Sequence, residues 1–139
     1  MHVANILIVD DVASLMPNKG SSELAEWSQV TENSRVTIKL LDLKGTILFA
    51  SPSHRRTYGQ ESNTYIRNSV FDFMYSEDIA KFIYATEIMM AKKESVSLQL
   101  RMRYRTHRWI RVETVCSPIY DPEGKIGNIV MTSRKIGVK

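Results

Sequence analysis

Side chains that could act as nucleophiles, metal ligands or haem ligands are few in this sequence and stand far apart. His54 and His107 lie in different segments from Cys116, and their spacing assigns no Ser-His-Asp or Cys-His set. No glycine-rich loop could cradle a phosphate, and no group of residues has the spacing of metal ligands. The sequence therefore predicts a protein that is not an enzyme, with no catalytic residue and no metal site.

Cys116 is the single cysteine, which leaves no partner for an internal disulfide and fits a reducing cytoplasm. It falls in an alternating segment, on the face shared with Ile110 and Val112. This placement predicts an inert buried thiol rather than a redox sensor. No apolar run is long enough to span a membrane, and residues 1–12 lack the basic region of a signal peptide. We therefore expect a cytoplasmic protein.

Arginines and aromatic residues crowd one predicted hairpin: Arg101, Arg103, Tyr104, Arg105, Arg108, Trp109 and Arg111. Because the net charge is +4, this cluster could contact nucleic acid, anionic lipid or a regulator protein. Strand alternation, however, places Arg101 and Arg103 on a solvent face, where Glu113 could pair with one of them across the strands. We expect a solvated strand face, and nucleic acid is the less favoured partner.

Residues 96–136 predict three long antiparallel strands. In residues 96–104 and 109–117, apolar and polar side chains alternate with the period of two that a half-buried strand requires. The turn Asp121 to Gly124 precedes a third strand over residues 126–134. Such a sheet has an apolar face that another part of the chain must cover.

The cover is predicted from the residues that precede these strands. Val36 to Ala50 alternates as a hairpin, and a short helix begins at Ser51-Pro52 and stops at Gly59. The longest helix begins at Ser76-Glu77-Asp78, which caps it, and ends at Lys92-Lys93. Its apolar face carries Ile79, Phe82, Ile83, Thr86, Met89 and Met90. We expect Ile79, Phe82, Ile83 and Met90 to pack on Leu98, Leu100, Ile110 and Val112.

Residues 1–33 predict a separate arm. Ile6 to Asp11 resembles the first strand and acidic pair of a two-component receiver domain, but no receiver sheet follows, and we favour an extra strand or a dimer contact. Met16 to Gly20 is typical of a linker. A flanking helix follows, with Leu24 and Trp27 at helical spacing.

Five stretches, in the same order as in the family, resemble a PAS domain. They are Asp42 to Ser53, Tyr58-Gly59, Ser69 to Asp78, Arg103 to Glu113, and Ser117 to Gly124. The third reads SVFDFMYSED and resembles the family's "s-l-f-d-f-v-H-P-E-D". The resemblance implies an α+β PAS fold, a five-stranded antiparallel sheet with helices on one face. We therefore expect an N-terminal arm and flanking helix over residues 1–33 and a PAS domain over residues 34–137.

The chain departs from the family at three places. Tyr75-Ser76 stands where His-Pro is usual, and His107 where a hairpin glycine is usual. Lys135 stands where many members carry an acidic residue that helps couple the sensor to its effector.

PAS folds often hold a ligand between the long helix and the sheet. The residues expected to line such a pocket are Phe71, Phe73, Phe82, Ile83, Thr86, Leu100, Met102, Ile110, Val112 and Cys116. Oxygen-binding haem sensors carry a histidine on the long helix, and residues 77–93 contain none. Flavin photosensors of the LOV type need a cysteine where this chain has Ser69. We predict no haem and no covalent flavin, which leaves non-covalent flavin or an unknown small molecule open, and we expect His54 and His107 at the surface.

The resemblance implies a sensor or interaction module for signal transduction. It would form a homodimer and relay ligand binding or partner contact to an effector, such as a histidine kinase of a two-component system, a cyclic-dinucleotide enzyme or a transcription regulator. The interface residues expected are Leu24, Trp27, Trp109, Arg111, Val115 and Met131. The alternative to this dimer is a flanking helix that folds back on its own sheet. The alternative function is a PAS-like adaptor that binds nucleic acid or a regulator protein through the arginine hairpin.

Overall fold

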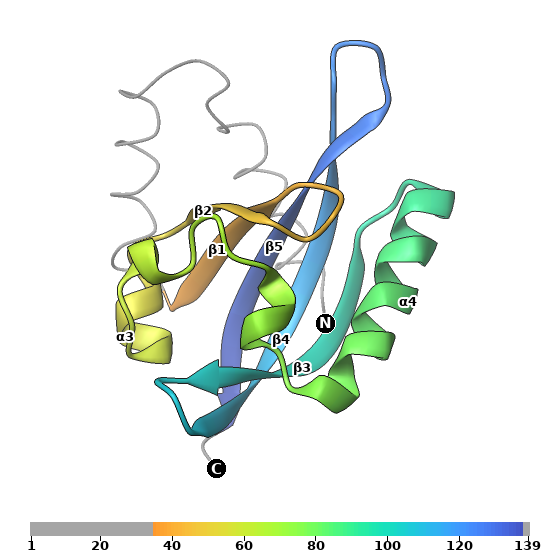
Figure 1. The fold of residues 1–139 in the computed structure, drawn as a ribbon. Coiled ribbons are helices and arrows are strands. Elements are labelled where there is room, and N and C mark those ends of the chain that lie inside the picture. The colour runs from red at the N-terminus through yellow and green to blue at the C-terminus, as the bar shows by residue number, and fades with distance from the viewer. Residues whose placement is uncertain (1–34, 138–139) are drawn as a thin grey trace.

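The computed structural model describes residues 35–137, which form a five-stranded antiparallel sheet with its helices on one face (Figure 1). The predicted arm and flanking helix, with Leu24 and Trp27, lie outside these described residues. The elements are β1 (Val36–Leu41), β2 (Ile47–Ala50), α3 (His54–Tyr58), η1 (Ser62–Thr64), η2 (Val70–Phe73), α4 (Ser76–Lys92), β3 (Val96–Tyr104), β4 (Arg108–Tyr120) and β5 (Ile126–Gly137). The predicted α+β fold is confirmed.

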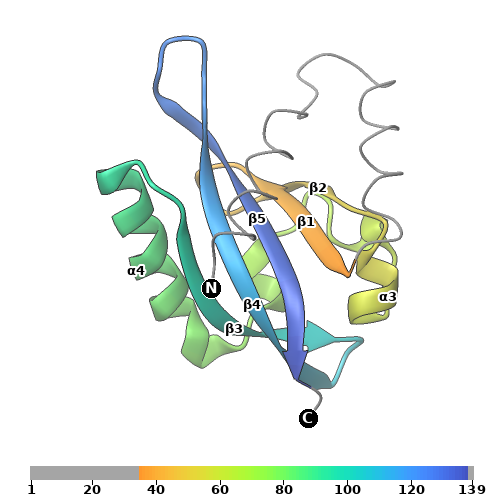
Figure 2. The same ribbon diagram turned by 180° about the vertical axis from the view of Figure 1, so that it is seen from behind.

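The strand order β2-β1-β5-β4-β3 places the N-terminal hairpin beside the C-terminal strand. Figure 2 shows the sheet from behind, with α3 and α4 on its far side. The face that carries these helices is called the inner face here, and the opposite one the outer face. Among residues 35–137, no helix has the length and apolar content needed to cross a bilayer.

Alternation along the strands gives each face its own apolar cluster, as expected of pleated strands. On the inner face, Ile110, Val112 and Cys116 of β4 join the main core, together with Phe82 and Met89 of α4. The outer face carries a smaller cluster of Ile38, Val115 and Val130. The two faces of β4 therefore divide as the alternation predicts.

Helix α4 rests on the sheet along a narrower line than its sequence predicts. Phe82 and Met89, which are two turns apart, are buried, whereas Ile83 is 42% exposed and Met90 37% exposed. A helix that packs on a sheet buries residues at three-, four- and seven-residue spacing, and the residue one position further is rotated by about 100° towards solvent. The prediction that Ile83 and Met90 pack on the sheet is therefore wrong.

The start of α4 also differs from its prediction. Ser76 is the first helical residue, and Tyr75 stands at the N-cap without a side-chain cap hydrogen bond. The Asp78 carboxylate turns instead to the edge of the sheet, where it accepts hydrogen bonds from the Arg101 backbone N–H (2.7 Å) and from its guanidinium (2.7 and 3.1 Å). This contact ties the first turn of α4 to β3.

Candidate ligand-binding site

The inner face carries a group of polar side chains beneath α3. They are Thr37 and Lys39 of β1, His54 and Tyr58 of α3, and Tyr65 just after η1. Each is no more than 1% exposed to solvent. This group is called the polar end of the core.

Strand β1 turns its more polar side towards the helices. Thr37, Lys39 and Leu41 are all buried, and Lys39 pairs across the strands with Ala50 of β2 and Met131 of β5. The other side of β1 carries Ile38, which belongs to the outer cluster. The neighbouring strands therefore enclose the lysine side chain within the domain.

Helix α3 supplies the opposite wall. Its buried residues are His54, Thr57 and Tyr58, which stand at the three- and four-residue spacing of one helix face. Gly59 ends the helix in the left-handed conformation, with φ of 79°. The Arg105 backbone N–H donates to the Tyr58 carbonyl (2.9 Å), so the β3–β4 turn fastens the end of α3.

The Lys39 ammonium group lies between two aromatic rings. Its Nζ is 4.7 Å from the centre of the Tyr58 ring and 5.5 Å from that of Tyr65, which are distances typical of cation–π contacts. The same atom is buried and has no hydrogen-bond partner in the described part of the chain. Burial lowers the pKa of Lys39 from 10.5 to about 7, because an ammonium without a counter-charge is poorly solvated there.

His54 is fully buried, so the prediction of a surface histidine is wrong. Its Nδ1 lies 2.9 Å from the Ser51 carbonyl oxygen, which can only accept, so Nδ1 carries the proton. Nε2 is then an acceptor, and it has no partner among the described residues. Burial, followed by the charge of Lys39, lowers the pKa of His54 well below its usual 6.5, and the ring is neutral.

The two tyrosines complete the group. The Thr37 hydroxyl donates to the Ser133 carbonyl (3.4 Å) and accepts from the Tyr58 hydroxyl (3.3 Å). The Tyr65 hydroxyl is buried and has no such partner in the described residues. Burial raises the pKa of both tyrosines, so their hydroxyls stay protonated at neutral pH. The Tyr58 and Tyr65 rings lie 5.3 and 4.7 Å from the His54 ring, centre to centre.

Most of the residues predicted to line a pocket belong to the main core. The main core includes Phe73, Phe82, Leu100, Met102, Ile110, Val112 and Cys116. Phe71 packs against it, whereas Ile83 is exposed and Thr86 is half-buried. Burial raises the pKa of the Cys116 thiol to about 12, as expected of an unreactive thiol. The Phe73 ring lies 4.5 Å from the Tyr65 ring and joins the two regions.

The predicted interface residues of the sheet fall on different surfaces. Val115 is buried in the outer cluster, and Arg111 is exposed. Trp109 is half-buried and meets the Tyr75 ring edge-on, at 5.1 Å. Met131 lies instead in the main core on the inner face, because its neighbour Val130 takes the outer position.

The hairpin arginines do not form one patch. Arg101 pairs with Asp78 rather than with Glu113, whose carboxylate pairs with Arg134 (2.6 Å). The Arg103 guanidinium lies over the Phe73 ring, 5.1 Å from its centre. Both arginines remain partly exposed, and the predicted pairing of one of them with Glu113 is wrong.

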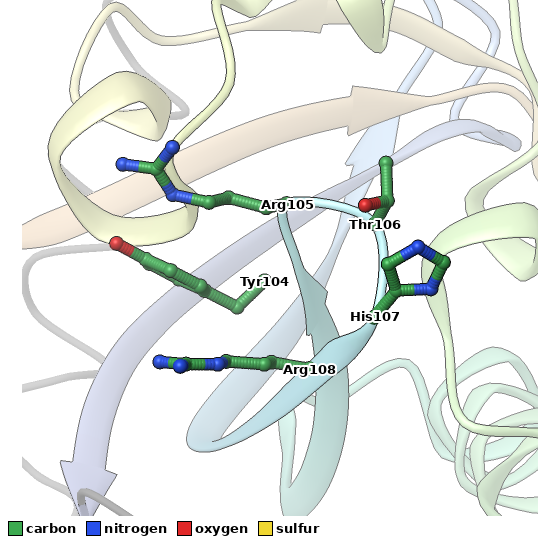
Figure 3. A pocket seen from close by; sticks show the side chains of 5 residues that line it. All are labelled: Tyr104, Arg105, Thr106, His107 and Arg108. Atoms are coloured by element: carbon green, nitrogen blue, oxygen red, sulfur yellow. The ribbon is translucent and has the colours of Figure 1, made fainter.

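The hairpin tip itself forms a surface hollow of about 430 Å³, lined by Tyr104, Arg105, Thr106, His107 and Arg108. Figure 3 shows the side chains of Tyr104, Arg105 and Arg108 extending side by side, while Thr106 and His107 stand at the turn. Arg105 and Arg108 are exposed. The tip therefore keeps two of the hairpin's cations available to a partner.

Residues 35–137 contain no group of three or more histidine, cysteine or acidic residues that could hold a metal ion.

The fold and this site define a known class of domain. A family model described as the PAS fold matches residues 47–133, more than half of the chain. The protein belongs to the PAS family, as its sequence motifs predict. No curated protein matches the sequence.

Solved PAS domains share this architecture at low sequence identity. The PAS domain of a protein from Colwellia psychrerythraea is 18% identical, with a TM-score of 0.73 over 81% of this chain and 96% of that one. The PAS-B domain of Drosophila melanogaster Cycle, with bound ethylene glycol, is 19% identical, with a TM-score of 0.66 over 72% and 99%. The PAS domain of an HTR-like protein from Haloarcula marismortui is 18% identical, with a TM-score of 0.67 over 83% and 93%. These likenesses show the shared fold.

Proposed function

We propose that this domain is a sensor module of a cytoplasmic signalling protein, which binds a small molecule at the polar end of its core and passes the change to an effector. The observation that carries the proposal is a set of three buried polar atoms without hydrogen-bond partners in the described chain: Lys39 Nζ, His54 Nε2 and the Tyr65 hydroxyl. They come from three separate segments, β1, α3 and the residues after η1. A ligand that meets all three would bind these segments together.

Unpaired buried polar groups are costly, which is why they indicate a site. Each one lowers the stability of a domain by about 1 to 3 kcal/mol relative to a paired group. Cores usually pair such groups or replace them with hydrocarbon. Three of them in one group, the lysine included, are therefore best explained by a partner molecule that supplies the missing hydrogen bonds.

Strand β1 supports the relay part of the proposal. Lys39 faces the site, and its neighbour Ile38 belongs to the outer cluster on the opposite face. Because Lys39 and Ile38 are adjacent in β1, a ligand that displaces Lys39 would also displace Ile38 on the outer face. Strand β1 also pairs with β5 along its whole length, from Val36 opposite Arg134 to Leu41 opposite Ile129. The effector would be a histidine kinase, a cyclic-dinucleotide enzyme or a transcription regulator.

A ligand titration tests the sensor proposal. The Cycle PAS-B structures hold ethylene glycol and glycerol, so glycerol serves as a neutral probe beside small organic acids. We expect at least one probe to move the backbone amide NMR signals of Lys39, His54 and Tyr65 in a saturable manner. The exposed Lys44, in the β1–β2 turn, is the reference position. If no neutral or acidic probe moves the three signals, the proposal is wrong.

The same proposal includes a homodimer through the outer face and the segment of Leu24 and Trp27. The outer face supports it with an apolar cluster of Ile38, Val115 and Val130. Light scattering of the full chain, and of a version that starts at Asn33, tests it at concentrations on the order of tens of micromolar. We expect a dimer for the full chain and a monomer for the shorter one. A monomeric full chain would support the intramolecular alternative, in which the segment folds back on its own sheet.

The hairpin tip supports a second candidate, an adaptor that binds nucleic acid or an acidic regulator. Its exposed Arg105 and Arg108 line the same hollow. Binding of a labelled single-stranded oligonucleotide, compared between about 50 mM and 200 mM salt, tests it. If the adaptor exists, the double variant R105Q/R108Q weakens binding and reduces its salt dependence. Without measurable binding by the wild type at low salt, the nucleic-acid form of this candidate is wrong.

A further inference from the structure

The ligand's chemical class can be argued from the charges around the polar end. We propose that this site binds a small monocarboxylate with a hydroxyl group next to the carboxylate, in which the carboxylate pairs with Lys39 and the hydroxyl donates to His54 Nε2. The inference rests on the proposed sensor function and adds to it the identity of the groups that the ligand presents.

The first step is the charge balance. Lys39 lies at the polar end, and Arg103 is close enough to lower the pKa of Tyr65. Four carboxylates of the domain have partners elsewhere. They are Glu61 with Arg55, Asp78 with Arg101, Glu113 with Arg134, and Asp42 with backbone N–H groups of its own turn. A buried cation needs a counter-charge or loses its proton, so an anion is the partner that fits Lys39.

The second step is the hydrogen-bonding pattern. The His54 ring donates through Nδ1 to the Ser51 carbonyl, so its Nε2 can only accept while the ring is neutral. A bare carboxylate has no proton to give it. A hydroxyl on the neighbouring carbon has one, and the Tyr65 hydroxyl can donate to the second carboxylate oxygen. A 2-hydroxycarboxylate therefore complements all three unpartnered atoms.

The third step is size and shape. The rings of His54, Tyr58 and Tyr65 lie 4.7 to 6.1 Å apart, centre to centre, so they pack against one another and leave room only for a small ligand beside them. The single buried ammonium also matches one negative charge rather than two. These features favour a small monoanion, of the size of glycolate or lactate.

Binding is expected to depend on pH through Lys39. In the folded protein without ligand, Lys39 has a pKa of about 7, and a bound carboxylate favours its protonated form. The other groups facing it do not titrate near this pH. His54 is neutral, and Tyr58 and Tyr65 keep their protons. Affinity should therefore be constant from about pH 5 to 7 and fall about tenfold per pH unit above about 7, since binding then takes up one proton.

Calorimetric titration of the full chain tests the inference with sodium lactate, acetate, phosphate and glycerol at about pH 6 and about pH 9. We expect lactate to bind about fivefold more tightly than acetate, because it supplies the missing hydrogen bond to His54. The variant K39M should weaken lactate binding about 100-fold, because the carboxylate loses its buried partner. K44M, an exposed lysine on the next turn, should bind as the wild type does. Y65F should weaken binding about fivefold.

The outcomes separate this inference from the sensor proposal. If glycerol binds and lactate does not, the ligand is neutral and the inference is wrong, while the sensor proposal stands. Phosphate binding in place of lactate would also overturn the carboxylate class. If lactate affinity is the same at about pH 6 and pH 9, or K39M still binds it, Lys39 is not the partner. A thermal melt of K39M shows whether the variant is folded, so loss of binding cannot be mistaken for loss of structure. If none of the probes binds, both proposals fail.

Discussion

The core of this domain has two ends that are built in different ways. Beneath α4, the side chains of Phe82, Met89 and Leu100 fill the space with hydrocarbon and aromatic carbon. Beneath α3, Lys39 and His54 bring polar atoms without partners into an equally buried position. The same sheet supports both ends, and the difference lies in the strand residues as well as in the helix residues that face them, with Lys39 of β1 at one end and Leu100 of β3 at the other.

The difference separates stability from recognition. Apolar burial stabilises the fold by about 25 cal/mol per Å², whatever the detailed geometry of the contact. A buried amine or imidazole without a partner lowers the stability instead, and is worth keeping where a ligand will pair with it. We therefore expect mutations at the apolar end to lower the free energy of unfolding, and mutations at the polar end to raise it or to change binding.

The largest loss of stability is expected at the apolar end. Phe82 is 3% exposed, so F82A should lower the free energy of unfolding by about 3 to 5 kcal/mol through lost contacts and a residual cavity. Urea denaturation, monitored by far-UV circular dichroism, measures this loss of stability. I83A, one residue along the same helix and largely exposed, is the control, with an expected change below about 0.5 kcal/mol. Equal losses in the two variants would contradict the placement of α4.

An intermediate effect is expected where α4 meets the sheet edge. D78N removes the charge that binds the Arg101 guanidinium and backbone N–H, and should lower the free energy of unfolding by about 2 kcal/mol. The hydrogen bonds from Arg101, its side chain first, lower the pKa of Asp78 below 3.8. The contribution is therefore fully present above about pH 4 and is lost as pH falls through the lowered pKa.

The control for D78N is D72N, an exposed carboxylate in η2. Denaturation of both variants and of the wild type at pH 7 and near pH 3 gives the comparison. We expect the difference in free energy of unfolding between wild type and D78N to be smaller near pH 3 than at pH 7, while D72N stays close to the wild type at both pH values. A gap that persists unchanged near pH 3 would show that the Asp78 charge is not its cause.

The alternation of side chains predicts the apolar end of the core better than the polar end. Period-two alternation places Val112 and Cys116 on the inner face of β4, as the structure has them. It does not say which face of β1 is inner. One side of β1 carries Val36, Ile38 and Leu40, and the other carries Thr37, Lys39 and Leu41. The pattern favours the more apolar side as the inner face. In the structure, however, the helices cover the side that carries Lys39.

His54 was missed for a related reason. A histidine in a short helix is usually at the surface, so its residue type favoured the wrong placement. The signal that could have found it is the spacing of His54, Thr57 and Tyr58, which share one helix face. The start of α3 obscured that signal, because the helix begins after Ser53 rather than at Ser51-Pro52. Which buried polar atoms lack partners depends on three-dimensional contacts, and no pattern in one sequence carries it.

At the polar end, K39M should stabilise the protein. The pKa of Lys39 is about 7 when folded and about 10.5 when unfolded, so between these values the unfolded chain binds one more proton. The free energy of unfolding of the wild type should then rise with pH by about 1.4 kcal/mol per unit from about pH 7 to 10. Below pH 7 the full cost of the buried charge remains. The difference in free energy of unfolding between K39M and the wild type should therefore be largest at and below about pH 7 and close towards pH 10.

Denaturation in buffers that lack carboxylates measures this gap, because a bound anion would offset the cost. K44M supplies the control for the loss of one positive charge at an exposed position, and its free energy of unfolding should follow the wild type at every pH. If K39M is less stable than the wild type at pH 7, the buried lysine is not a cost, and the contrast between the two ends fails.

The smallest effect is expected at the glycine that closes α3. Gly59 has φ of 79°, and a Cβ there would lie 2.9 Å from Arg105 Cγ. G59A should lower the free energy of unfolding by about 1 kcal/mol from the backbone conformation, with a small addition for moving the arginine side chain. G124A is the matched control, since Gly124 has φ of 84° and no atom within 4 Å of the new Cβ. The two variants strain the backbone alike, but only Gly59 holds the helix that carries His54 and Tyr58. G59A should therefore also weaken ligand binding, whereas G124A should leave it unchanged. Equal binding by both variants would show that the left-handed glycine at the end of α3 does not position the polar end.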